Sequence, residues 1–183
     1  KLYAFEPAPP AFDALHTNTS LYCRGAKVFN CGISDRDGEL TFTYYAKSSV
    51  FSSFHPDKNE DAHAIKSIVR NVLKSNSLDA EQADSVSEAF MTDRLDSKAF
   101  QCQIRSLSSI IREENIQQID LLKLDSEKSE LPVLRGIEDD HWDLIKQMVI
   151  EVHDSVGDIY RQIRELLTKK GFHCEVEEEQ LLT

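Results

Sequence analysis

The sequence predicts an α/β fold built on a mostly parallel sheet. Short apolar runs typical of buried strands, such as residues 119–124 and 148–152, alternate with segments whose apolar residues recur at helical spacing. Strands that alternate with helices favour parallel pairing, with helices on both faces of the sheet. The chain has 183 residues, enough for one domain with a hydrophobic core. We therefore expect a single domain over residues 1–183.

The first elements expected are strand, helix, strand, turn and strand. Residues 2–5 form an apolar run, and the three prolines that follow suit the start of a helix. A second strand is expected near residues 26–33, with 28–33 inside the sheet. The sequence Asp35-Arg36-Asp37-Gly38 is typical of a turn, and residues 40–45 after it are rich in β-branched and aromatic side chains. This pattern predicts a strand that returns after the turn.

Residues 46–95 interrupt the alternation. Serines are frequent at the beginning of this stretch, and apolar residues then recur at helical spacing between Ile65 and Leu73. The apolar content of the stretch is too small for an independent core. We interpret residues 46–95 as a helical insertion rather than a second domain.

The alternation resumes near residue 99 and continues to the end of the chain. Ser106 would cap a helix, Gly136 would lie near the end of the next helix, and Lys169-Lys170-Gly171 is typical of a helix C-terminus. The strands expected in this part are residues 99–104, 119–124 and 148–152, and a further strand that begins within 172–176. Residues 119–124 and 148–152 are expected to be neighbours of 2–5 and 28–33 in one mostly parallel sheet.

Composition excludes some classes of function. The formal net charge is −11, so the average field repels a phosphate backbone and we expect no nucleic-acid partner. No apolar run approaches the length of a membrane span, so we expect no membrane partner. The four cysteines match no zinc pattern and indicate reduced thiols in a cytoplasmic protein.

Polar residues follow four of the expected strands. In parallel α/β sheets the ligand binds beyond the carboxyl ends of the strands, so these residues are the candidates for a site. Each acid could instead cap the next helix, and His153 could be structural. No glycine-rich nucleotide loop is present among the six glycines. The candidates are Glu6, Ser34 and Asp35, Asp125 and Glu127, and Glu151 and His153.

Four stretches of the chain resemble the FkbM family of S-adenosylmethionine-dependent methyltransferases. They are KLYAFEPAPPAFDAL at 1–15, GISDRDGELTF at 32–42, IDLLKLDSEKSELPVLRGI at 119–137 and MVIEVHD at 148–154, in the order found in the family. Most members read DVEG where this chain has Asp125-Ser126-Glu127-Lys128. The form seen here is similar to the subgroup associated with polyketide and nonribosomal peptide synthases.

The resemblance implies a Rossmann-like class I methyltransferase sheet that uses S-adenosylmethionine. It implies O-methylation of a hydroxyl or enol on a small molecule or a carrier-bound intermediate, with neighbouring synthase domains as possible partners. It also implies that the family's glycine loop would precede Lys1 and its final strand would follow Thr183. On this basis we expect the domain to be incomplete at both ends, and residues 1–183 alone to bind the cofactor poorly.

The resemblance also implies a role for each candidate residue. Glu6 would hold the ribose of the cofactor, and Ser34 and Asp35 would lie near the adenine. Asp125 would face the reacting methyl group or the acceptor, as would Glu127. Glu151 and His153 would line the acceptor pocket. His153 is the preferred catalytic base because its reference pKa lies near neutrality, with Asp125 and Glu127 as further catalytic residues.

Three alternatives stay open from the sequence. The acids could hold a divalent metal that acidifies the hydroxyl, although the spacing requires none and we predict no metal. The chain could be a noncatalytic remnant that serves as a scaffold or binding module in a synthase. It could also be a nucleotide-sugar or dinucleotide enzyme of similar architecture, against which the ordered motifs argue.

Overall fold

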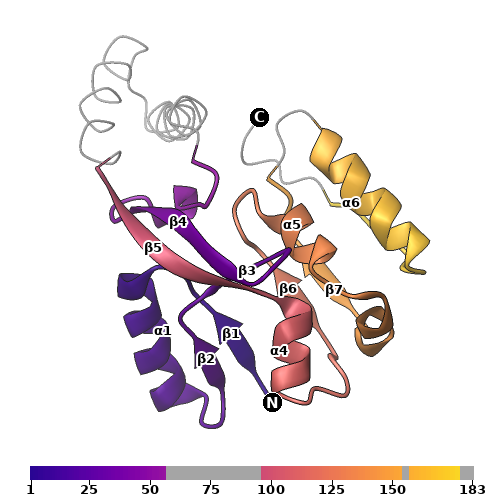
Figure 1. The fold of residues 1–183 in the computed structure, drawn as a ribbon, viewed down its shortest axis with the longest axis horizontal. Coiled ribbons are helices and arrows are strands. Elements are labelled where there is room, and N and C mark those ends of the chain that lie inside the picture. The colour runs from indigo at the N-terminus through magenta and orange to yellow at the C-terminus, as the bar shows by residue number, and fades with distance from the viewer. Residues whose placement is uncertain (57–95, 154–156, 178–183) are drawn as a thin grey trace, which may run out of the picture.

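A computed structural model describes residues 1–56, 96–153 and 157–177 and shows an α/β fold (Figure 1). The strands are β1 (Tyr3–Phe5), β2 (Lys27–Phe29), β3 (Gly32–Ser34), β4 (Gly38–Tyr45), β5 (Ser97–Ser106), β6 (Leu122–Leu124) and β7 (Met148–Ile150). The helices are α1 (Pro9–Tyr22), α4 (Leu107–Glu113), α5 (Glu130–Arg135) and α6 (Asp158–Lys169), with short 3₁₀ turns η1 (Ser49–Phe51) and η2 (Asp139–Leu144). Most of the expected helical insertion, residues 57–95, lies outside the described residues.

The strands of the described residues form three separate hydrogen-bonded sheets. β1 pairs with β2 and β6 pairs with β7, both in parallel. β5 lies between β3, its parallel partner, and β4, its antiparallel partner. Three of the four pairings are therefore parallel, which confirms the α/β class and the mostly parallel sheet.

We expected four neighbouring strands in one sheet, at residues 2–5, 28–33, 119–124 and 148–152. This expectation is wrong, because these segments fall in different hydrogen-bonded sheets. Residues 28–33 are divided between β2 and β3, which belong to different ladders. Asn30 is the physical reason for the division. Its side-chain amide donates to the carbonyl oxygens of Glu6 and Pro7, so the chain stops following β1 at this point.

Two further strand predictions need correction. Residues 38–45 do return antiparallel, but their partner is β5, which separates them from β3. Residues 172–176 form no strand. The amide of Phe172 bonds to the Leu167 carbonyl, and its ring packs against Trp142 with 6.1 Å between centroids. The Phe172 side chain, which led us to expect a strand, therefore packs into the hydrophobic core after the end of α6.

The helix signals are confirmed. The Ser106 hydroxyl accepts a hydrogen bond from the Ser109 amide at 3.0 Å and caps α4, and Gly136 ends α5. Helix α1 starts at Pro9, as expected, but none of its residues is buried, and Leu21 is exposed. Within the described residues, no helix has the length and apolar character needed to cross a membrane.

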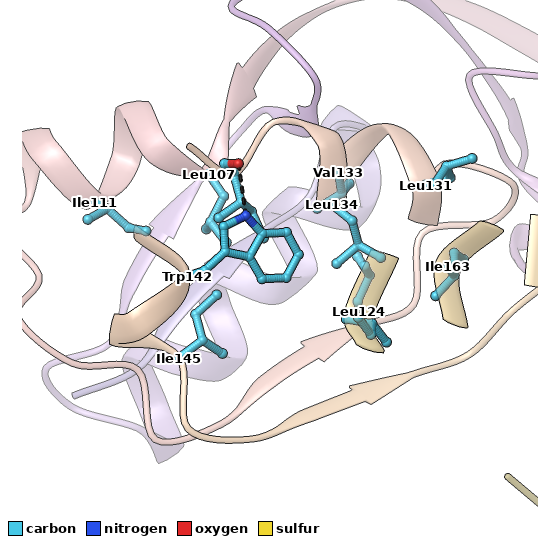
Figure 2. Close-up of a cluster of buried hydrophobic side chains, with 11 residues drawn as sticks. Leu107, Ile111, Leu124, Leu131, Val133, Leu134, Trp142, Ile145 and Ile163 are labelled. Carbon is cyan, nitrogen blue, oxygen red and sulfur yellow. Dashed lines mark hydrogen bonds between the residues drawn. The ribbon is translucent and has the colours of Figure 1, made fainter. Parts of the chain in front are cut away.

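The main hydrophobic core surrounds Trp142 (Figure 2). The indole N–H donates to the Ile137 carbonyl at 3.1 Å, so the one polar atom of this buried ring has a partner. The core joins α4, β6, α5, η2 and α6, which are the elements around the ends of β6 and β7 (Figure 1). Its buried members are Leu107, Ile111, Leu124, Leu131, Val133, Leu134, Ile137, Trp142, Ile145, Ile163 and Leu167.

Candidate active site at the ends of β6 and β7

Four of the candidate residues meet where β6 and β7 end. Leu124 and Ile150 are paired in the ladder, and the Glu151 amide donates to the Leu124 carbonyl one step later. The two strands therefore end at the same level, which brings Asp125 and Glu127 beside Glu151 and His153. Ligand atoms of Asp125, Glu127 and His153 lie within 4.8 Å of one another. These three side chains therefore converge, as expected of residues that follow adjacent parallel strands.

The imidazole of His153 lies among carboxylates. Its Nε2 is 3.3 Å from Glu127 Oε2 and 3.6 Å from Glu151 Oε1. Its Nδ1 is 3.0 Å from Oε1 of Glu130, the first residue of α5. We call Asp125, Glu127, Glu130, Glu151 and His153 the His153 cluster.

The backbone that carries Glu127 is strained. Glu127 and Lys128 have φ values of 37° and 67°, in the left-handed region that non-glycine residues rarely adopt. The hydroxyl of Ser53 donates to the Glu127 carbonyl at 2.9 Å and supports this turn. Strained turns of this kind persist only where surrounding contacts fix them, and they are frequent at functional sites.

Asp125 is held at the edge of the cluster. Lys123 Nζ lies 2.9 Å from Asp125 Oδ2. Both side chains are partly exposed, at 64% and 35% of their area, so this ion pair contributes little to stability. The lysine offsets part of the negative charge and fixes the Asp125 carboxylate near His153.

Two groups in the His153 cluster have shifted pKa values. Burial raises the pKa of Glu127 to about 7, an effect that the nearby His153 partly opposes. The hydrogen bond to Glu130 is the main cause that raises the pKa of His153 above its ordinary value. Shifted pKa values of this kind, at neighbouring groups in a strand-end cluster, are typical of general acids and bases.

The other candidates make local contacts. Glu6 Oε1 accepts the Ala8 amide hydrogen at 2.8 Å near the start of α1, and burial raises the Glu6 pKa. Ser34 is buried at the end of β3, with its hydroxyl 3.4 Å from Asp35 Oδ1. Asp35 is exposed and pairs with Arg36 at 3.0 Å. These contacts fit the capping and turn roles that acids often have after strands.

Glu130 is the residue of the cluster that the sequence did not single out. Its side chain is fully buried, with 0% of its area exposed. A signal was available, because Glu130 lies four residues before Leu134 and therefore on the same, core-facing side of the helix. An acid at a core position of a helix indicates either a buried partner or a functional role.

The geometry of the cluster would also admit a cation. Asp125, Glu127 and His153 each offer one ligand atom, and oxygen and imidazole ligands suit several divalent metals. Exposed acidic groups often gather without a metal, so the spacing alone identifies none. The absence of a metal requirement stays a prediction.

The chain is similar to known methyltransferases along nearly its whole length. A family profile described as "Methyltransferase FkbM domain" matches residues 1–174. The chain is 36% identical over 180 residues to the 31-O-demethyl-FK506 methyltransferase FkbM of Streptomyces tacrolimicus. It is 31% identical over 182 residues to the methyltransferase sdnD of Sordaria araneosa, and 32% over 189 residues to the AMB antimetabolite synthetase AmbE of Pseudomonas aeruginosa.

The matches differ in how much of each relative they cover. The match to the FkbM protein covers 98% of this chain and 66% of the relative, and the match to sdnD covers 94% of this chain and 64% of the relative. The match to AmbE covers 100% of this chain but only 9% of the synthetase. The chain therefore spans about two thirds of the length of the stand-alone relatives and a small part of the synthetase. No solved structure matches the chain.

Proposed function

The chain belongs to the FkbM methyltransferase family, and from that premise we propose that it forms part of an S-adenosylmethionine-dependent O-methyltransferase. The proposed acceptor is a hydroxyl or enol on a polyketide, a peptide or a similar small molecule. The observation that carries the proposal is the His153 cluster, which holds an imidazole and several carboxylates at the carboxyl ends of two parallel strands. Ligands of α/β sheets bind at that edge.

The names of the relatives support oxygen as the acceptor atom and a synthase as the setting. One relative is named for a substrate that lacks a methyl group on an oxygen, and another is a synthetase in which the matching part is 9% of the length. An acceptor bound to a carrier protein, with neighbouring synthase domains as partners and a cytoplasmic location, fits both. Nucleic acid and membranes are not proposed partners.

The proposed chemistry needs a base and a means of alignment. When bound, S-adenosylmethionine supplies a methyl group on a sulfonium sulfur, which leaves as a neutral thioether when the acceptor oxygen bonds to the methyl carbon. His153 Nε2 takes the hydroxyl proton as that bond forms. Glu127 and Asp125 orient the acceptor beside the methyl group, and Glu151 lines the acceptor's position with His153.

The residues proposed to hold the cofactor fit it to different degrees. Glu6 is half-buried at the end of β1, and its Oε1 already accepts the Ala8 amide, so a ribose hydroxyl would be bound mainly by Oε2. Asp35 is exposed and would accept a hydrogen bond from the adenine amino group, whereas buried Ser34 would act by orienting Asp35. The cofactor roles of Glu6, Ser34, Asp35 and Asp125 are proposals that binding experiments test.

A product assay tests the proposed function. The full-length protein is incubated with methyl-labelled S-adenosylmethionine and a panel of hydroxyacyl and enol acceptors, free and attached to phosphopantetheine carriers. We expect a labelled methyl ether, identified by mass spectrometry and NMR. A C-methyl or N-methyl product would contradict the proposal.

Two further arms separate the alternatives. A scaffold without activity would bind neighbouring synthase domains and give no labelled product with any acceptor. If activity is lost with a chelator and restored by Mg²⁺, the acids of the His153 cluster would act through a metal. Unchanged activity with the chelator would support the metal-free mechanism.

A further inference from the structure

We infer that Glu130 is the residue that positions the His153 ring, by fixing its tautomer so that Nε2 is the nitrogen available to the acceptor. The inference rests on the proposed function, in which His153 takes the acceptor's proton. It assigns a role to a residue that lies behind the imidazole, on the side of Nδ1, and not among the exposed acids of the cluster.

The hydrogen bond determines which nitrogen carries the proton. Glu130 Oε1 lies 3.0 Å from His153 Nδ1, and an ionised carboxylate can only accept a hydrogen bond. Nδ1 therefore carries the hydrogen, and the lone pair of the neutral ring is on Nε2. Nε2 is also the nitrogen that faces Glu127 and Glu151, where the acceptor hydroxyl would bind.

Stability alone does not explain a carboxylate at position 130. Glu130 is fully buried, and its Oε2 has no hydrogen-bond partner among the described residues. Its helix neighbours Leu131 and Val133 are buried apolar side chains of the main core. Replacing both partners of a buried ion pair by apolar residues is often neutral or stabilising, so the stability of the core does not by itself require this pair. The acid is therefore best explained by its contact with His153.

The electrostatics of the cluster agree with this geometry. The bond to Glu130 is the first cause of the raised pKa of His153, ahead of the nearby charges of Glu127 and Glu151. Without Glu130, the pKa of His153 would fall. The acid limb of the pH–rate profile, which reports loss of a proton from the base, would then move to lower pH. Among the described residues, Asp125 also lies beside the ring, and Lys123 pairs with that carboxylate.

The decisive variant is Glu130→Leu, compared with Glu130→Gln and Glu130→Asp in the full-length protein. We expect kcat to fall on the order of 10–100-fold in Glu130→Leu, with little change in KM or in S-adenosylmethionine affinity. Because the change leaves His153 without its buried partner, the melting temperature should fall, and kcat is therefore compared per folded molecule. Glu130→Asp should retain more activity than Glu130→Leu, because it keeps the accepting carboxylate.

A double variant separates positioning from a general structural effect. In a His153→Ala background, Glu130→Gln should cause no further loss of kcat, since its effect passes through the imidazole. Ser108→Ala is the matched control, because the buried Ser108 hydroxyl bonds Nδ1 of a different histidine, His141, at 2.8 Å. We expect that control to lower the melting temperature and leave turnover per folded molecule unchanged.

Nitrogen NMR of the histidine rings gives a readout that does not need turnover. We expect the hydrogen of neutral His153 on Nδ1 in the unmodified protein and a mixture of tautomers in Glu130→Leu. A dominant Nε2–H form in the unmodified protein would overturn the inference, as would normal kcat and an unmoved acid limb in both Glu130→Leu and Glu130→Gln. Absence of any methyl transfer, with the tautomer as expected, would count against the proposed function instead.

Discussion

Glu127 and His153 hold protons differently from the same side chains in water. Burial favours the neutral form of Glu127 and raises its pKa to about 7, while the bond to Glu130 favours the charged form of His153. The two groups are 3.3 Å apart, so the charge of one alters the proton affinity of the other. Their protonation is therefore a property of the pair rather than of either side chain alone.

The first prediction is that His153→Ala removes most of the activity of the full-length protein. Loss of the proposed base should lower kcat roughly 10²–10⁴-fold, and the affinity for S-adenosylmethionine should stay nearly unchanged. Turnover, calorimetric binding and melting temperature would be measured on the same preparation. A lower melting temperature with normal turnover per folded molecule would show that His153 is structural.

The second prediction concerns stability against pH. Because the pKa of Glu127 is raised from 4.5 to about 7, the folded protein binds more protons than the unfolded chain between these values. Stability should therefore fall as pH rises from about 4.5 to about 7. His153, whose pKa is also raised, adds a further loss above its ordinary value of 6.5.

Urea unfolding at several pH values measures this dependence. Glu127→Gln should flatten the fall between pH 4.5 and about 7, and Glu165→Gln, on the exposed side of α6, should not. An equal slope in the protein and in Glu127→Gln would mean that Glu127 is not the group responsible.

The sequence predicted four of the five residues of the His153 cluster and missed the fully buried one, Glu130, together with the supporting Ser53. Asp125 and His153 follow apolar strands, and the strand-end rule for parallel sheets brings such residues together. Glu130 and Ser53 could not be found by that rule. Their roles depend on where α5 and the chain after β4 pack against the cluster, which are contacts between distant parts of the sequence.

Helices were easier to predict than strands because their ends carry local signals. The Ser106 cap and the Gly136 terminus act within one turn of the chain, so four or five residues suffice to recognise them. Strand ends depend on partners instead. The break between β2 and β3 comes from the Asn30 side chain bonding backbone near Glu6, 24 residues away.

The third prediction is that Gly136→Ala is destabilising for a steric reason. A Cβ atom at Gly136 would overlap the backbone carbonyl oxygen of Ser34 and lie 3.1 Å from the Asp35 Cα. Neither backbone atom can move aside by a rotamer change, so we expect a loss of about 1–3 kcal/mol in the free energy of unfolding. The contact joins the end of α5 to the end of β3.

Urea unfolding measures this loss. Arg135→Ala, at the exposed neighbouring position of α5, is the control and should change stability by no more than about 0.5 kcal/mol. If Gly136→Ala is as stable as that control, the close approach of α5 to Ser34 would be incorrect.

The order of strands within the sheets could not be predicted from local sequence patterns. β5 follows residues 57–95 in the chain, yet it enters between β3 and β4, which are separated by a short turn. The pattern of residues 26–45 predicts two consecutive strands joined by a turn. Nothing in that pattern indicates that a later strand, β5, lies between β3 and β4. The parallel pairing of β6 and β7 was predictable because the helical segments α5 and η2 connect them.

The last prediction tests whether the main core supports the molecule as one unit. Trp142 is 4% exposed, stacks edge-on with Phe172 and bonds to the Ile137 carbonyl. Trp142→Ala should lower the free energy of unfolding by about 3–5 kcal/mol, since it leaves a cavity and an unpaired carbonyl. Tyr22→Ala, at a side chain 85% exposed, should change stability by no more than about 0.5 kcal/mol.

The effect of Trp142→Ala on function should follow from folding alone. The elements around Trp142 also hold the His153 cluster, so the two should unfold in one transition, seen at the same urea concentration by circular dichroism and by loss of methyl transfer. Below that transition, turnover per folded molecule should equal that of the unmodified protein, because none of the contacts of Trp142 described above involves His153. Activity lost at a lower urea concentration than the circular dichroism signal would show that the cluster opens separately from the core.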